Sequence, residues 1–511
     1  MPFRALLRMV LLAILMPQAL FAATYYVDSH GGADSNSGLS AQASWKTLER
    51  LNAEHLHPGD HILFRSGGRW RGQLAPKDSG ASGRPIVFDR YGDGTLPEID
   101  GAGMVEDTIL LRNVQQIEIR HLAVTNQGAG DKVRRGVDLV LDNYGRARHL
   151  VIDDLYIHDV DGTLARKDNG GIVFRTLGNR VHSRFDDLEI ERNIVWKVDR
   201  SGIVASSSDV DRATWRPSRN VLIADNYVAD IGGDGIVPWA TDGAVVEGNV
   251  ADHCNHRSHQ ANAGIWQWST DNTLFTMNEA FGTGGTLDGE GFDSDFNSRN
   301  TRFFHNFSHD NQGGFMLICT PGDHTPAWNI GNIGTRIVEN ISRNDDGLLI
   351  NLSGATQVTV ARNLFYVGAA NRAQFITSSW KGWPTDASFR SNRFYVQGDL
   401  VFGHGVERLK DGSYRVAPGW GGATHLSFTG NSIWGRVEDP PAGAMLHAGK
   451  QDVGQAVDWS TEPKFDPSHP DEYARYLTLH RTWLRALFNR EFSPQTTDTD
   501  RVRAMQNHSG S

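Results

Sequence analysis

Short segments in which apolar and polar residues alternate recur along the middle of the chain, and a turn follows each one. In four of them a small or acidic residue precedes a glycine and then a large apolar residue. These triplets are Asp234-Gly235-Ile236, Ala263-Gly264-Ile265, Glu290-Gly291-Phe292 and Gly313-Gly314-Phe315. We interpret them as the start of one equivalent strand in successive coils of a solenoid, because period-2 alternation is typical of strands.

A second repeat supports this interpretation, since an asparagine ends the same strand at intervals of 23 to 34 residues. Its positions are Asn193, Asn226, Asn249, Asn278, Asn306, Asn340, Asn363 and Asn392. Internal repeats of this period indicate a solenoid, and stacked asparagines can hydrogen-bond one another at a turn. No helical pattern separates the strands after Pro85. The sequence therefore predicts an all-β fold, a single-stranded right-handed parallel β-helix.

The two ends of the chain differ from this repeat. Residues 1–23 have a short basic segment, an apolar run and Ala22-Ala23, the layout of a signal peptide. We expect residues 24–84 to form an N-terminal cap with a short helix from Ser44, and residues 85–435 to form the β-helix, with about ten coils. Residues 436–511 form a C-terminal segment, in which apolar spacing predicts a helix at 473–492 beside the open end and a disordered tail after it.

Charge and cysteine content narrow the class of protein. The net charge is −10 with both signs interspersed, which argues against nucleic acid and anionic membranes as partners. Cys254 and Cys319 fall about two coils or roughly 10 Å apart, beyond the ~7 Å limit for a disulfide, so we expect two buried free thiols. Together with the leader, these features predict a monomeric protein that is secreted or periplasmic.

The alternation also predicts which side chains face outward. If the apolar residue of each triplet points inward, the residues one and three places later point out. This outward set is Val237, Trp239, Trp266, Trp268, Asp293, Asp295, Met316 and Ile318. Exposed indoles are costly without a ligand, and the apolar face of a pyranose stacks well on them. The alternative is that the loop from His253 to Asn262 covers the indoles.

The carboxylates of the outward set suggest catalysis. Hydrolysis of a glycosidic bond needs two carboxyl groups, and Asp293 and Asp295 have Cα atoms about 6.7 Å apart on one strand face. This separation is compatible with an inverting and with a retaining enzyme. Asp234 and Glu290 would support the pair, because crowded carboxylates raise one another's pKa. Asp293, Asp295 and Glu290 could instead bind Ca²⁺; we expect no other cofactor.

Several motifs resemble those of a known superfamily. Tyr25-Tyr26-Val27-Asp28 and Trp45-Lys46-Thr47-Leu48 are similar to the N-terminal cap of secreted β-helix proteins. The segments 271–273, 289–295 and 308–315 resemble a pattern in the pectate-lyase-like right-handed β-helix superfamily. That resemblance implies a polysaccharide or oligosaccharide substrate, cleaved by a hydrolase or a lyase. The signatures of polygalacturonases and pectate lyases are missing.

Two other functions remain open at this point. A lyase acting on a uronate-containing glycan needs a base and a cation, which His256, Arg257, His259 and His309 could supply next to the indoles. A non-catalytic glycan-binding or adhesive solenoid would use the same outward wall without any chemistry. We predict the glycoside hydrolase, with the lyase as the alternative.

Overall fold

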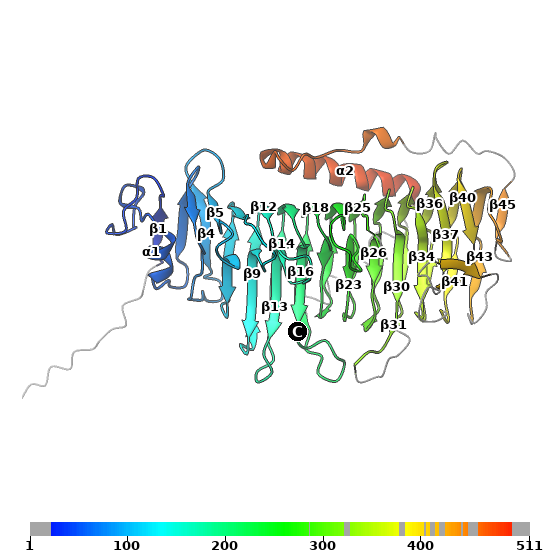
Figure 1. Ribbon diagram of the computed structural model, residues 1–511, viewed down its shortest axis with the longest axis horizontal. Helices are drawn as coiled ribbons and strands as arrows, with labels where there is room; N and C mark the ends of the chain where they lie inside the picture. Colours follow the sequence, from blue (N-terminus) through cyan, green and yellow to red (C-terminus); the bar gives the residue numbers. More distant parts are fainter. Residues whose placement is uncertain are drawn as a thin grey trace, which may run out of the picture.

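The computed structural model describes residues 22–285, 287–320, 328–377, 384–402, 405–408, 414–417, 425–440, 443–447 and 458–492. Three long sheets, all built from parallel strands, run the length of the molecule (Figure 1). Sheet 1 has 16 strands and runs from β1 (Thr24–Val27) to β43 (Ser427–Thr429). Sheet 2 has 14 strands and runs from β3 (Arg69–Arg71) to β45 (Met445–His447).

Sheet 3 has 11 strands and carries the residues of the predicted outward set. In chain order its strands are β6 (Asp107–Arg112), β9 (Arg135–Asp142), β13 (Gly170–Leu177), β16 (Ser201–Ser207), β19 (Ile236–Val237), β23 (Ile265–Gln267), β26 (Glu290–Ser294), β30 (Gly314–Cys319), β34 (Gly347–Ser353), β37 (Arg372–Thr377) and β40 (Asp399–Phe402). The chain visits the three sheets in turn, so each circuit is one coil. The fold is the predicted right-handed parallel β-helix.

The interior is filled by the residues that the alternation placed there. Ile236, Ile265 and Phe292 are fully buried in one continuous apolar core. At the turn between sheets 1 and 2, each ladder asparagine donates its Nδ2 to the Oδ1 of the asparagine in the next coil, from Asn193 to Asn431. These side chains are buried, and Asn431 extends the ladder by one coil beyond the prediction.

The coil count and the N-terminal region differ from the expectation. Counting both ends, the main path of sheet 1 has twelve strands from β4 (Ile86–Tyr91) to β43, more than the predicted ten or so coils, because the coils before Asn193 carry no ladder asparagine. The strands β1 and β2 (His61–Arg65) already belong to sheet 1, so residues 24–84 continue the solenoid. The helix α1 (Leu48–Ala53) starts after Ser44, with Thr47 as its N-cap, because Trp45 pairs with Val27 in extended conformation.

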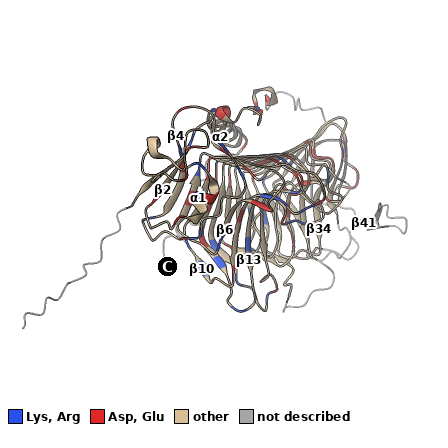
Figure 2. Ribbon diagram, turned by 60° about the vertical axis from the view of Figure 1, so that its left-hand side comes forward, with Lys and Arg blue, Asp and Glu red and all other residues tan. Residues whose placement is uncertain are grey.

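The helix α2 (Tyr473–Glu491) matches the predicted span but not the predicted place. It lies along the outer face of sheet 2 and not beside the open end of the solenoid (Figures 1 and 2). Its buried face packs on apolar residues of that sheet, among them Phe307 and Tyr227. The predicted leader, up to Phe21, and the predicted tail from Ser493 lie outside the described residues. Within the described part, no helix is long and apolar enough to span a membrane.

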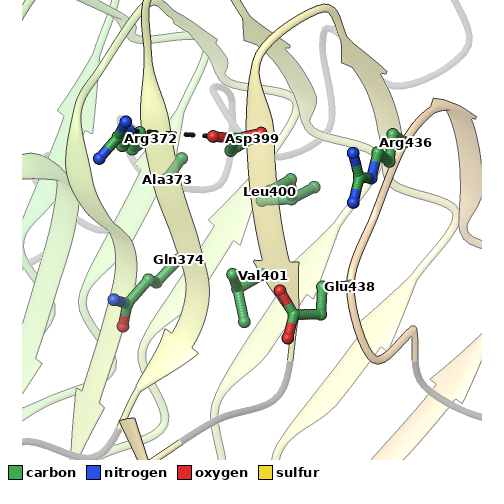
Figure 3. Close-up of a pocket in the computed structure, with 8 residues that line it drawn as sticks. All are labelled: Arg372, Ala373, Gln374, Asp399, Leu400, Val401, Arg436 and Glu438. Atoms are coloured by element: carbon green, nitrogen blue, oxygen red, sulfur yellow. Dashed lines mark ion pairs between the residues drawn. The ribbon is translucent and has the colours of Figure 1, made fainter. Parts of the chain in front are cut away.

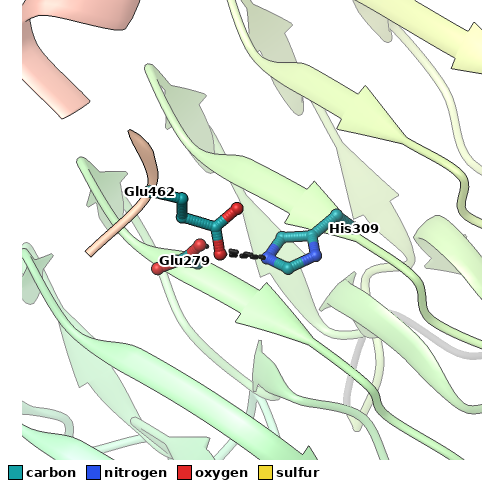
Figure 4. A group of neighbouring side chains, drawn as sticks. All are labelled: Glu279, His309 and Glu462. Atoms are coloured by element: carbon teal, nitrogen blue, oxygen red, sulfur yellow. Dashed lines mark hydrogen bonds and ion pairs between the residues drawn. The ribbon is translucent and has the colours of Figure 1, made fainter. Parts of the chain in front are cut away.

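A buried ionic network fastens this C-terminal segment to the sheet (Figure 4). Glu279 on β25 (Glu279–Phe281) contacts His309 Nε2 at 3.0 Å and His480 Nε2 of α2 at 2.6 Å. Glu462, which precedes α2, lies 3.6 Å from the same His309 nitrogen. Burial alone would lower the pKa of His309, but Asp310 and Glu279 raise it to about 9. Burial alone would raise the pKa of Glu279, but His480 and His309 lower it to about 2.

We predict that Glu279→Gln destabilises the protein in a pH-dependent way. Breaking a buried charged pair should lower the free energy of unfolding by about 3 kcal/mol. The Glu279 contribution is present above pH 4.5 and is lost as the pH falls through about 2. The His309 contribution is present below pH 6.5 and is lost as the pH rises through about 9. Urea denaturation should therefore show the largest deficit between these two limits, at pH 4.5–6.5.

The exposed Glu49→Gln on α1 serves as a matched control, and its effect should be small at every pH. A deficit of Glu279→Gln that is equal at pH 6 and at pH 10 would show that the network does not act through these charges.

Candidate active site

The strand β26 presents two carboxylates on the outer face of sheet 3, as the alternation predicts. Phe292 and Ser294 are completely buried inside the coil, and Asp293 and Asp295 project on the other side. Asp293 is nonetheless only 4% exposed, whereas Asp295 is half-buried. The outer face is therefore a packed surface in which Asp295 is more accessible to a ligand than Asp293.

In the next coil, the structure differs from the predicted outward set. Phe292 pairs with Met316 and Asp293 with Leu317, so the register is one residue off from the triplet alignment. Met316 and Ile318 lie in the core, and the outward residues of β30 are Leu317 and Cys319. The alignment failed because Phe315 and Met316 are both buried in the core, after Gly314 with a φ of 125°.

Two further acids join this face. Glu290 begins β26 and is buried, and Asp288 lies two residues earlier, where it is half-buried. Asp288 has a φ of 58°, which places its backbone in the left-handed region at a tight turn before the strand. We call Asp288, Glu290, Asp293 and Asp295 the acidic cluster.

Burial and mutual repulsion make the acidic cluster hard to ionise. Burial raises the pKa of Asp288 to about 7, with the charge of Asp295 as the next cause. Burial raises the pKa of Asp295 to about 6. For Asp293 and Glu290, burial and the neighbouring carboxylates raise the pKa well above the usual range. Carboxylic acids that stay protonated near neutrality are what general acid catalysis requires.

Asp234 lies close enough to this cluster for its charge to raise the pKa of Asp288, but basic and indole groups contact its own carboxylate. Lys167 Nζ lies 2.9 Å and Arg200 3.0 Å from its carboxylate, and Trp266 donates its Nε1–H at 2.8 Å. Lys167 also lies 4.6 Å from the centre of the Trp266 ring. Asp234 thus connects the segments that contain Lys167, Arg200 and Trp266, and these contacts indicate a structural role.

The tryptophans of the outward set divide into two kinds. Trp266 is 5% exposed, since it packs with Val173, Val204 and Val237 and Lys167 lies over its ring. Lys167 is itself hydrogen-bonded to the carbonyl of Ala261, at the end of the predicted covering loop. Trp239 and Trp268 are half-buried, and their ring centres are 4.2 Å apart. Phe296 extends this row, 5.3 Å from Trp268. The Nε1 atoms of Trp239 and Trp268 are buried and have no hydrogen-bond partner among the described residues.

The basic residues proposed for a lyase have other partners or lie elsewhere. Arg257 is paired with Asp230 and with the carbonyl of Val198. His256 is exposed and hydrogen-bonded to the carbonyl of Gly282, and His259 is exposed. His309 is buried on sheet 2 beneath the C-terminal segment, so the structure does not bring it to the indoles.

Sequence reasoning missed three residues of this site. Asp288 was hidden because an Asp-Gly pair is an ordinary turn signal. Lys167 arrives from a loop about 67 residues before Asp234, and no local pattern reports such a contact. Cys319 was missed because the triplet alignment placed Ile318, and not Cys319, on the outer face of β30.

Metal binding has one geometric candidate in the described part of the chain. Glu279, His309 and Glu462 have ligand atoms within 4.8 Å of one another, but they form the network that holds α2. The acidic cluster lies at sheet 3, apart from this network. A calcium site built from Asp293, Asp295 and Glu290 stays a prediction.

A hollow of about 420 Å³ lies further along the same sheet, over β37 and β40 (Figure 3). Arg372, Gln374, Arg436 and Glu438 surround an apolar floor that includes Leu400. The 3.8 Å ion pair between Arg372 and Asp399 is largely exposed, so its strength is small. This hollow is three strands away from the acidic cluster.

Comparisons with known proteins agree with this picture. A lacto-N-biosidase of Bifidobacterium longum is 30% identical over 63% of this chain. Two crystal structures of a GH136 lacto-N-biosidase from Eubacterium ramulus, native and selenomethionine, superpose with a TM-score of 0.61 at 24% identity. Each superposition covers 83% of this chain and 68% of the Eubacterium ramulus chain. No protein-family model matches.

The extent of these matches limits what they show. The chain spans about a quarter of the length of the Bifidobacterium protein, 26%. The superposition shows the fold, and the predicted resemblance to the pectate-lyase-like right-handed β-helix superfamily is confirmed at that level. The class defined by fold and site is thus a parallel β-helix protein with a buried acidic cluster beside a row of aromatic rings.

We predict that Asp234→Asn destabilises the protein by about 3–5 kcal/mol, because it leaves Arg200 buried without its anion. Asp242→Asn is the matched control, since its ion pair with Arg219 is partly exposed and should contribute less than about 1 kcal/mol. Chemical denaturation measures both. Equal losses for the two variants would contradict the anchoring role.

Proposed function

We propose that this protein is an exported glycoside hydrolase that acts on an oligosaccharide. The observation that supports the proposal most strongly is the acidic cluster, in which Asp288 and Asp295 are partly exposed and have raised pKa values. Asp295 stands next to Trp268 of the neighbouring coil. The similarity to a lacto-N-biosidase makes a lacto-N-bioside the first substrate to test. The proposed location, outside the cytoplasm, rests on the leader-like N-terminus.

The structure favours Asp288 and Asp295 as the reacting pair. A general acid must reach the glycosidic oxygen, and both residues are half-buried, whereas Asp293 is 4% exposed. The charge of Asp295 is the main neighbour effect on Asp288, as expected for two carboxyls that share one site. Asp293 and Glu290, buried and protonated, then act as hydrogen-bond donors that support the pair. This assignment moves one role from Asp293, the residue chosen from the sequence, to Asp288.

The chemistry follows from the pKa order. Asp288, with the higher pKa, donates its proton to the glycosidic oxygen as the bond to the anomeric carbon breaks. Asp295, with the lower pKa, either attacks that carbon or takes a proton from the attacking water. Lys167 lowers the pKa of both acids by its charge, which keeps Asp295 ionised in a crowded acidic environment.

The aromatic row supplies the binding surface in this proposal. Trp239 and Trp268 are half-buried and lie against each other, and their exposed ring surface can stack on the apolar face of a pyranose.

We predict that Asp288→Asn and Asp295→Asn each lower kcat by a factor of ~10² or more, because each removes a group that transfers a proton or attacks. Asp293→Asn should lower kcat less, since an amide still donates a hydrogen bond. Release of p-nitrophenol from p-nitrophenyl lacto-N-bioside measures all three, and circular dichroism confirms the fold. A larger loss of kcat in Asp293→Asn than in Asp288→Asn would show that Asp293, and not Asp288, is the general acid.

A panel of polysaccharides and oligosaccharides separates the classes of function. New reducing ends alone support the hydrolase, whereas ultraviolet absorbance of unsaturated uronates would establish the lyase. Binding without either signal would establish the non-catalytic solenoid.

We predict a narrow bell-shaped dependence of kcat on pH, with its optimum between about 6 and 7. Below that range Asp295 becomes protonated and loses its role as base or nucleophile. Above it Asp288 loses the proton that it must donate. A profile that stays flat from pH 5 to 9 would rule out this pair of acids.

A further inference from the structure

One oxygen of the Asp295 carboxylate is held by two donors. The backbone N–H of Phe296 donates to Oδ1 at 2.9 Å, and the thiol of Cys319 donates to the same oxygen at 2.6 Å. Among the described residues, none donates a hydrogen bond to Oδ2. The orientation of the carboxylate is thus defined from one side only, and Oδ2 is the oxygen available to a ligand.

The fold places Cys319 at this position through the parallel pairing of neighbouring coils. Ser294 pairs with Ile318, so the next residue on each strand, Asp295 and Cys319, stand side by side on the outer face. Cys319 is 3% exposed, and it forms no disulfide. Its side chain therefore meets the carboxylate and not the solvent.

A thiol is suited to this position because it remains protonated there. Burial raises the pKa of Cys319 well above its usual range, and the negative charge of Asp295 adds to that effect. The sulfur consequently stays an S–H donor across the pH range in which Asp295 titrates. A thiolate would repel the carboxylate, but the site disfavours it.

We propose that Cys319 is a positioning residue: its S–H group donates to Oδ1 of Asp295 and holds the carboxylate so that Oδ2 faces the substrate. This inference rests on the proposed function of Asp295. Cys319 is nearly inaccessible to a ligand and contacts Asp295, so it acts through the carboxylate.

The titratable and charged groups around Asp295 determine how its pKa responds when the Cys319 donor is removed. Asp293 faces it from the same strand, Asp288 from the preceding loop, Lys167 from the loop before β13, and Cys319 from β30. The hydrogen bond from Cys319 lowers the pKa of Asp295 against the effect of burial. Removing the donor should therefore raise that pKa and move the acidic limb of the activity profile to higher pH.

The test compares Cys319→Ser, which keeps an O–H donor, with Cys319→Ala and Cys319→Val, which remove it. With p-nitrophenyl lacto-N-bioside, Ala and Val should shift the acidic limb upward by about 0.5–1 pH unit and lower kcat about tenfold, with KM little changed. Ser should restore the limb. Val is larger than cysteine and Ala is smaller, so Val leaves no cavity and decides the matter if the gap left by Ala prevents folding.

Cys254→Ala is the control, because this other free thiol is buried in the core, away from the acidic cluster, and its removal should leave the profile in place. Titration of ¹³C-labelled aspartate, with the Asp295 signal assigned by its loss in Asp295→Asn, gives the same answer without a substrate. Profiles of Ala and Val that coincide with the wild type, or a Ser variant that behaves like Ala, would overturn the inference. An Asp295→Asn variant with full activity would instead overturn the proposed function.

Discussion

The parallel register between successive coils is the constraint on which the whole site depends. Each strand of sheet 3 lies one strand spacing, about 4.8 Å, from its neighbours, so residues in equivalent places form rows along the molecule. One row contains Trp239, Trp268 and Asp295 and ends at Cys319. Residues that are distant in sequence thus meet without any flexible loop, and a one-residue slip would send every member of the row into the core.

Burial determines how readily the carboxyl groups of the acidic cluster ionise. Burial raises the pKa of each carboxyl group of the acidic cluster, to about 7 for Asp288 and to about 6 for Asp295. Such crowding is costly, and the neighbouring contacts offset part of it. Lys167, anchored by Asp234, supplies a positive charge beside the acids. The C-terminal helix stabilises sheet 2 through Glu279 and lies along that sheet.

The sequence predicted the fold well because the fold is periodic. Alternation placed Ile265 and Phe292 inside and Asp295 outside, and the asparagine repeat marked the turns. Errors arose where a local rule competes with the repeat. Two consecutive core residues after Gly314 broke the alternation. The sequence pattern therefore placed Met316 and Ile318 on the outer face, where the structure has Leu317 and Cys319. Lys167 could not be predicted, because a long-range contact from an irregular loop leaves no local pattern.

The central claim is that the acidic cluster and the indoles form one glycan-cleaving site. A crystal structure of the Asp295→Asn variant soaked with lacto-N-biose tests it most directly. The account predicts a sugar ring stacked on Trp239 or Trp268, with its anomeric carbon between residues 288 and 295. Sugar bound instead in the hollow beside Arg372 and Glu438, with the indoles unoccupied, would contradict it.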